Sequence, residues 1–344
     1  MINNAQMRRP SRKTALASIL FAGAMLAVAV TVEAQQPAEK IPRIGFLTPI
    51  SASDPQSVLR LDAFRQGLRD LGYVEGKNIN IEYRYAEGRP ERLPALAEEL
   101  VRLKVDIFVV ANDATARAAK KSTATTPIVM AGSGNPIGSG VIASLARPGS
   151  NVMGLTTYTA ELLGKRLELL KEVVPKVSRF AFLNAADSAA TASGEAFNEA
   201  QGPAKVLGVQ FKLVEVKAQN PDIEGAFRII GKERIGALIT SPVPAILFHR
   251  KRILELLENN RIPAMHSQQE WTNAGGLMSY GANIVDLNRR AAVYVDKILK
   301  GAKPADLPVE QPMKFEFIIN LKTAQQIGLT IPQTVLYRAD KVIK

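Results

Sequence analysis

The chain has 344 residues, of which 47% are hydrophobic and 22% charged, with a formal net charge of +12 and no cysteine. This hydrophobicity excludes an intrinsically disordered chain, and a single long apolar run, 15–32, excludes a protein with many membrane spans. The lack of cysteine excludes disulfides, thiolate metal sites and cysteine nucleophiles, and with only two histidines, His249 and His266, we expect no histidine-based metal or triad chemistry.

The N-terminal segment has the pattern of a secretory signal peptide, residues 1–34. Four basic residues between Arg8 and Lys13 precede the apolar run, and Val32-Glu33-Ala34 supplies a cleavage site after Ala34. An uncleaved membrane anchor is the alternative, because a run of about 18 residues is at the short limit for a spanning helix. Cleavage lowers the formal charge from +12 to +9. With no cysteine to carry a lipid, we expect a mature protein free in the periplasm.

The first half of the remaining chain alternates short apolar strands with amphipathic helices. Strands are predicted at 44–47, 79–85, 106–111 and 127–131, and helices at 55–71, 90–103, 114–121 and, after a glycine-rich turn, just before Arg147. Asp54 and Pro55 form a typical helix start, with an N-cap followed by proline at the first helical position. These alternating elements predict a parallel sheet with helices on both faces.

A second series of the same kind follows. Strands are predicted at 179–184, 209–216, 237–240, 262–265 and 277–280, and helices at 160–173, 189–207, 223–230 and 246–259. The basic run 250–252 lies near Glu255 and Glu258, which indicates a solvated helical face and not a nucleic-acid site. A helix at 285–299, a proline-rich link at 303–312, a strand at 315–319 and a short C-terminal helical stretch follow.

The predicted fold class is α/β, with two Rossmann-like lobes that have parallel sheets and are joined by a hinge of several crossovers. Lobe 1 is predicted to comprise 41–156 plus about 283–312, and lobe 2 to comprise 157–282 plus about 313–344. This division agrees with a typical domain size of roughly 150 residues.

Several segments resemble those of the extracytoplasmic substrate-binding proteins of ABC transporters, in the group described as tryptophan- or aromatic-amino-acid-binding-like. The matching segments are FRQGL (64–68), LGYVEGKNI (71–79), NPIGSG (135–140), SLARPG (144–149), GLMSYG (276–281), ILKGAKPADLP (298–308) and 315–329. The resemblance implies the type I periplasmic binding protein fold, closure of two lobes over a small solute, and docking on an inner-membrane ABC permease with its cytoplasmic ATPase. Asn135 stands where many relatives have aspartate, so a carboxylate contact to an amino group is weakened or replaced.

The candidate ligand-binding residues lie where the strands end, because ligands of open α/β sheets bind outside the carboxyl ends of the strands. Ser133 and Thr115 would take a carboxylate, and Tyr158 or Tyr280 would cover an apolar part. Capping by Asn112 or Asp113 and packing of the tyrosines between lobes are the alternatives, and Trp271 is predicted at the surface or rim and His249 exposed. The full set is Thr48, Ser51, Asn112, Asp113, Ala114, Thr115, Ser133, Asn135, Tyr158, Asn184, Ser188, Ser241, His266 and Tyr280.

No catalytic template fits the chain, and the glycine spacing at 132–138 is GxGxxxG, which argues against a dinucleotide loop. We therefore expect a non-enzymatic, monomeric receptor of an ABC importer for an amino acid or aromatic carboxylate, with no cofactor, metal or nucleic-acid partner. A ligand sensor of the same fold feeding a signalling receptor, or an exported α/β enzyme, are the alternatives.

Overall fold

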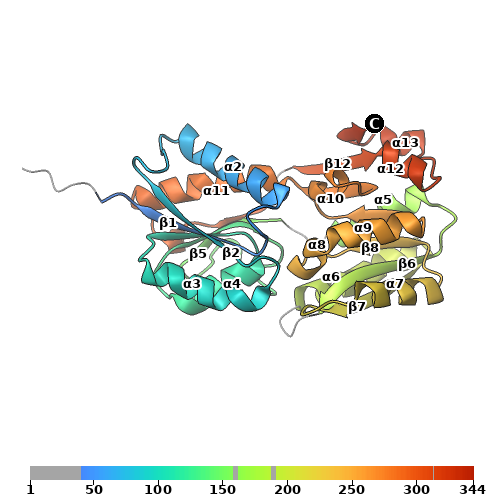
Figure 1. Ribbon diagram of the computed structural model, residues 1–344, viewed down its shortest axis with the longest axis horizontal. Helices are drawn as coiled ribbons and strands as arrows, with labels where there is room; N and C mark the ends of the chain where they lie inside the picture. The colour runs from blue at the N-terminus through green and yellow to red at the C-terminus, as the bar shows by residue number, and fades with distance from the viewer. Residues whose placement is uncertain (1–39, 158–161, 187–190, 313) are drawn as a thin grey trace, which may run out of the picture. The chain divides into compact units, whose positions relative to one another are not determined.

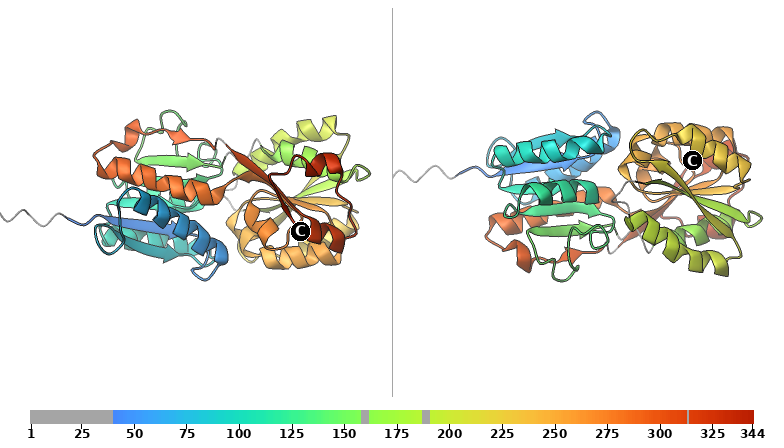
Figure 2. Two further views of the ribbon diagram at one scale, coloured as in Figure 1. Left: turned by 90° about the horizontal axis from the view of Figure 1, so that it is seen from above. Right: turned by 90° about the horizontal axis from the view of Figure 1, so that it is seen from below.

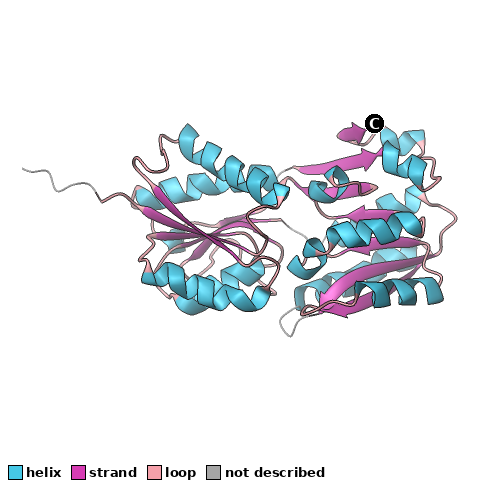
Figure 3. Ribbon diagram, viewed as in Figure 1, coloured by secondary structure: helices cyan, strands magenta, loops and turns pink. Residues whose placement is uncertain are grey.

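The computed structural model describes residues 40–157, 162–186, 191–312 and 314–344. These residues form two β-sheets, each with helices on both faces (Figure 3). The predicted signal peptide lies outside the described residues. Within the described part of the chain, none of the helices combines the length and the apolar character that a membrane span requires.

The first sheet has six parallel strands in the order β11-β5-β4-β3-β1-β2. Its strands are β1 (Arg43–Thr48), β2 (Asn80–Tyr85), β3 (Ile107–Val110), β4 (Ile128–Ser133), β5 (Val152–Thr156) and β11 (Val309–Glu310). Helices α2 (Pro55–Asp70) and α11 (Ile284–Leu299) pack on one face, and α3 (Leu93–Arg102) and α4 (Asp113–Ser122) on the other (Figure 1). The short 3₁₀ helices η1 (Pro90–Arg92) and η2 (Pro304–Asp306) complete this part.

Local sequence explains how α2 begins and how closely it packs. The Asp54 carboxylate accepts the Gln56 N–H at 2.8 Å, and Pro55 is the first helical residue, as predicted. Gly67 lies against α11, where a Cβ would stand 2.3 Å from the carbonyl oxygen of Arg289. The missing side chain therefore permits the two backbones to approach.

The second sheet has seven strands in the order β13-β12-β10-β9-β8-β6-β7. They are β6 (Arg179–Ala186), β7 (Gln210–Lys217), β8 (Ala237–Thr240), β9 (Ala264–His266), β10 (Met278–Ala282), β12 (Phe315–Asn320) and β13 (Lys341–Ile343). One face carries α5 (Leu162–Val173), α6 (Thr191–Val206), α12 (Leu321–Gln326) and α13 (Gln333–Leu336). The other carries α7 (Ile223–Lys232), α8 (Pro244–Phe248), α9 (Arg250–Asn259) and α10 (Gln269–Asn273).

The chain passes between the two sheets three times, as the colours of Figure 2 show. It leaves the first sheet after β5, returns after β10 into α11, and leaves again after β11 to form β12. The observed architecture is thus the predicted pair of α/β lobes with several connections.

Three predicted elements are wrong in detail. The second sheet is not wholly parallel, because β12 starts on the side where β10 ended and so runs antiparallel to it. The predicted helix 246–259 is two helices, α8 and α9, since the backbone of His249 (φ −89°, ψ 12°) leaves the helical region. The short helix before Arg147 is a series of turns, with Gly140 in the left-handed region at φ 70°.

Candidate functional site

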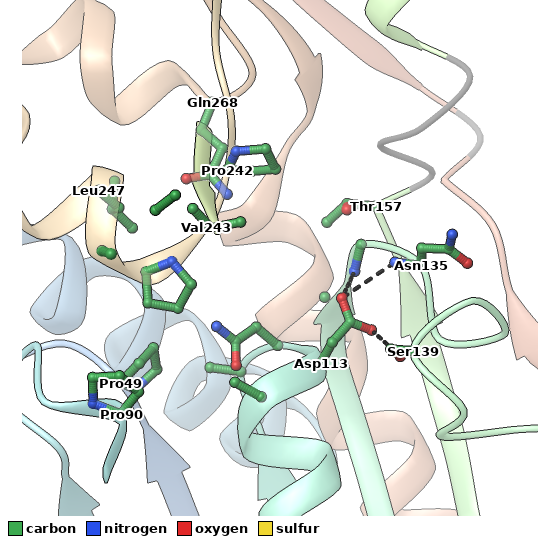
Figure 4. Close-up of a pocket in the computed structure, with 18 of the residues that line it drawn as sticks. Pro49, Pro90, Asp113, Asn135, Ser139, Thr157, Pro242, Val243, Leu247 and Gln268 are labelled. Carbon is green, nitrogen blue, oxygen red and sulfur yellow. Dashed lines mark hydrogen bonds between the residues drawn. The ribbon is translucent and has the colours of Figure 1, made fainter. Parts of the chain in front are cut away.

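A cavity of about 140 Å³ lies between residues of the two sheets, at the carboxyl ends of their strands (Figure 4). From the first sheet, Ala111–Ala114 follow β3, and Gly134 with Asn135 follows β4. From the second sheet, Pro242 follows β8 and Gln268 follows the β9 strand. Parallel strands end at one edge, so residues far apart in sequence converge on a single space.

Apolar side chains form much of the cavity wall. Leu163 and Phe182 come from α5 and β6, Leu247 from α8, and Ile284 from the start of α11, while Val243 precedes α8. A wall of this kind with a few polar groups is typical of sites for small organic molecules. The cavity can therefore accommodate a solute with an apolar body.

Asn112 is the N-cap of α4, which is the role that the capping alternative assigned to Asn112 or Asp113. Its side-chain oxygen accepts the Thr115 N–H at 3.0 Å, and its own N–H donates to the Thr115 hydroxyl at 3.0 Å, which makes a reciprocal capping box. Thr115 is fully buried in this cap, whereas Asn112 lines the cavity. One residue thus caps the helix and faces the cavity.

Asp113 holds the loop that follows β4. Its carboxylate accepts hydrogen bonds from the Gly134 N–H at 2.9 Å, the Asn135 N–H at 3.2 Å and the Ser139 hydroxyl at 3.2 Å, and also from the hydroxyl of Ser133. Figure 4 shows Asp113 between this loop and the cavity. Four donors, one from the end of β4 and three from the loop after it, thus fix the loop against α4.

Three arginines line the cavity and give it positive charge. Arg60 of α2 donates from Nη2 to Glu270 Oε1 at 2.8 Å, and Arg166 of α5 donates from Nε to the carbonyl of Tyr280 at 2.8 Å. Burial lowers the pKa of Arg166 to about 9, so the side chain stays protonated at neutral pH. The third, Arg117, lies on α4 and is half-buried.

Comparison with known proteins shows the family to which the chain belongs. Residues 47–343 match the family described as ABC transporter substrate binding protein. The chain belongs to that family. A structure of an ABC domain in complex with L-Trp from Streptococcus pneumonia is 26% identical and covers 88% of this chain and 99% of its own, with a TM-score of 0.79.

Two further proteins resemble this substrate-binding protein. A conserved domain protein from Vibrio cholerae is 24% identical, with a TM-score of 0.80 over 88% of this chain and 100% of that chain. The tyrosine-binding protein of Clostridioides difficile is 24% identical over 266 residues, which make up 77% of this chain and 75% of the relative. The fold is that of the type I periplasmic binding proteins.

Four of the predicted site residues line the cavity of the substrate-binding protein. They are Asn112, Asp113, Ala114 and Asn135. Ser133 is buried directly beside them through its hydrogen bond to Asp113, and Thr115 is buried in the α4 cap. Tyr158 and Ser188 lie outside the described residues.

Other predicted residues are placed close to the cavity but are not part of its wall. Thr48 is buried and its carbonyl accepts the Ala86 N–H, while Ser51 is half-buried near Ser53. Tyr280 is half-buried beside the core of the second lobe, where it packs against Phe315 and Phe317.

A row of buried polar side chains lies at the carboxyl edge of the second sheet. Asn184 follows Leu183 of β6, Ser241 follows β8, and Ser267 follows β9, at matching register positions. Within the described residues, Asn184 Oδ1 and the hydroxyls of Ser241 and Ser267 lack hydrogen-bond partners. The residues that follow these three in the sequence, Ala185, Pro242 and Gln268, line the cavity. The polar row therefore lies directly behind the cavity wall.

His266 and Trp271 form a buried aromatic stack, which corrects the prediction of Trp271 at the surface or rim. Both side chains are fully buried, and the rings are nearly parallel with centroids 4.4 Å apart. Thr240 Oγ1 lies 2.9 Å from His266 Nδ1, and burial lowers the His266 pKa to about 3. His266 is therefore a neutral side chain of the core. His249, predicted exposed, is half-buried.

Among the described residues, two ion pairs join the lobes, and sequence reasoning missed both. Arg60 pairs with Glu270, and Arg250 pairs with Asp54 through Nη1 at 2.9 Å and Nη2 at 3.1 Å. Arg250 is thus not on the predicted solvated face, since only 16% of its side chain is exposed. A basic residue at the start of a helix gives no local signal for a partner 196 residues away.

Proposed function

We propose that the protein is the periplasmic solute receptor of an ABC importer. It binds a small molecule in the cavity between its lobes and delivers the molecule to an inner-membrane permease that a cytoplasmic ATPase drives. The cavity at the converging strand ends is the observation that carries this proposal, because that edge is where open α/β sheets bind ligands.

The proposed solute is an amino acid or an aromatic carboxylate. The apolar wall around Phe182 and Leu247 suits a hydrocarbon or ring, and the arginines suit a carboxylate. Relatives described as bound to L-Trp and as tyrosine-binding support this class of ligand.

In the proposed cycle, ligand binding biases a hinge equilibrium between two lobe arrangements. The lobes would be 41–156 with about 283–312, and 157–282 with about 313–344. The pairs Arg60–Glu270 and Asp54–Arg250 would stabilise the arrangement in which the lobes lie together over the solute. That arrangement would then be presented to the permease.

A thermal-shift screen of the protein purified from a periplasmic extract tests the proposal. We expect at least one amino acid or aromatic acid to raise the unfolding temperature, since a ligand that binds only the native state stabilises it. A well-folded sample that no member of a panel of amino acids, aromatic acids, nucleosides and sugars stabilises would contradict the receptor role. N-terminal sequencing of the same sample should begin at Gln35, directly after the predicted cut.

A further inference from the structure

Arg117 differs from the other two cavity arginines in its surroundings. It lines the cavity from the second turn of α4 and is half-buried. Arg60 donates to Glu270 and Arg166 donates to the Tyr280 carbonyl, but within the described residues Arg117 has neither a hydrogen bond nor an ion pair. A guanidinium with five donors facing an enclosed space is well suited to bind an anion, and a carboxylate fits it through two parallel hydrogen bonds.

The carboxylate of Asp113 is not open to a ligand. The Ser133 and Ser139 hydroxyls donate to its Oδ1, and the N–H groups of Gly134 and Asn135 donate to its Oδ2. A carboxylate has about four acceptor positions, so these four donors occupy it fully. Asp113 is also the only carboxylate among the described residues that line the cavity.

These two observations have opposite consequences for the two ends of an amino acid. A carboxylate can pair with Arg117 and gain charge-assisted hydrogen bonds. An ammonium group that enters the cavity loses its hydration and finds no available carboxylate among the described wall residues. Burying such an unpaired charge costs free energy.

We propose that Arg117 binds the carboxylate of the solute and that the cavity prefers carboxylic acids with an apolar body over the corresponding α-amino acids. The inference rests on the proposed receptor function and narrows its ligand class. It distinguishes this protein from the relatives described as binding tryptophan and tyrosine, which are amino acids.

Calorimetric titration with matched sets of three compounds tests the preference. One set is 3-phenylpropionate, L-phenylalanine and phenethylamine, and the parallel sets carry indole, 4-hydroxyphenyl and straight alkyl groups. Within a set that binds, the acid lacking an amino group should bind more tightly than the amino acid. The amine, which lacks a carboxylate, should show no binding at the same concentrations.

Variants of Arg117 test the residue itself. R117Q should weaken binding of the preferred acid at least tenfold, because loss of a charge-assisted hydrogen bond of roughly 1.5–3 kcal/mol exceeds the 1.4 kcal/mol that equals a factor of ten. R117K, which keeps the charge but not the planar fork, should lose less affinity. R102Q is the matched control, since Arg102 lies on α3 with 67% of its side chain exposed and does not line the cavity. Urea unfolding of each variant verifies that its fold is intact.

The outcomes separate this inference from the proposed function. Unchanged affinity in R117Q, or an amino acid that binds as tightly as its deaminated acid or more tightly, would overturn the inference while the receptor function stands. Binding of sugars, nucleosides or amines but of no carboxylate would do the same. A folded protein that binds no compound of either panel would contradict the receptor function itself.

Discussion

The buried pair between Arg60 and Glu270 provides the sharpest test of how the two lobes are held together. Arg60 lies on α2, which packs on the first sheet, and Glu270 lies on α10 beside the second sheet. Nε and Nη2 of Arg60 lie 3.2 and 2.8 Å from Glu270 Oε1. The side chains are only 8% and 0% exposed. E270Q removes the negative charge and keeps a similar shape.

The expected cost follows from the geometry of the pair. Two unit charges 2.8 Å apart attract by about 6 kcal/mol at an effective dielectric constant of ~20, and the desolvation of both groups offsets much of this attraction. Removing one partner leaves the other charge buried, which costs about 3–5 kcal/mol. Because glutamine retains a carbonyl acceptor for Arg60, we expect E270Q to lose about 3 kcal/mol of unfolding free energy, the low end of that range.

Equilibrium urea unfolding of E270Q, R60Q and the double variant measures the effect as a double-mutant cycle. The double variant should be less destabilised than the two single effects combined, because removing both charges leaves neither one unpaired. E255Q serves as control, since Glu255 pairs with Arg252 at the surface and its loss should barely move the midpoint. Purely additive single effects, or wild-type stability of E270Q, would refute the assignment of this pair as a contact that stabilises the lobe arrangement.

Three further results are expected. G154A should lose more than about 3 kcal/mol of unfolding free energy, because Gly154 has φ 124° and a Cβ there would stand 2.3 Å from the Met130 carbonyl oxygen. The control G208A lies in a left-handed turn with open space and should lose about 1 kcal/mol. Equal losses in the two variants would contradict this reasoning. His266 has a pKa of about 3 in the folded protein, below the usual 6.5, so the unfolded chain takes up its proton first as pH falls. Stability should therefore drop by about 1.4 kcal/mol per pH unit below pH 6.5, and H266Q should lack this component of the slope in urea titrations between pH 6.5 and 4.5. Acrylamide should quench the fluorescence of the fully buried Trp271 weakly in the native protein and strongly after denaturation, whereas strong native quenching would mean that the ring is exposed.

Much of the fold could be predicted because its signals are local. The caps at Asp54 and Asn112 depend on side chains that bond to backbone groups two or three residues away. The buried strands appear as apolar runs, and their alternation with helices indicates an α/β architecture. The errors occur where local pattern competes with tertiary context, as at His249, where Arg250 begins a new helix and contacts Asp54 of the other lobe.

The lining of the cavity was predicted only in part for the same reason. The rule that ligands bind at the carboxyl ends of strands selects Asn112, Asp113 and Asn135, all of which line the cavity. It could not select Arg117, because an arginine in the middle of a helix is common on solvated faces. Nor could it place Glu270 beside Arg60, since 210 residues separate them.

The amino-acid sequence by itself determined most of the strands and helices and their arrangement as two α/β lobes, because periodicity and capping act over a few residues. It also predicts the strand edge at which we expect a ligand to bind. Only the tertiary structure decided which side chains share the cavity and that two ion pairs link the lobes. It also decided that Asp113 accepts hydrogen bonds from the loop after β4 while Arg117 faces the cavity. Those facts depend on contacts between distant parts of the chain. The burial of a charged group and the identity of its partner are set only when those parts come together in the fold.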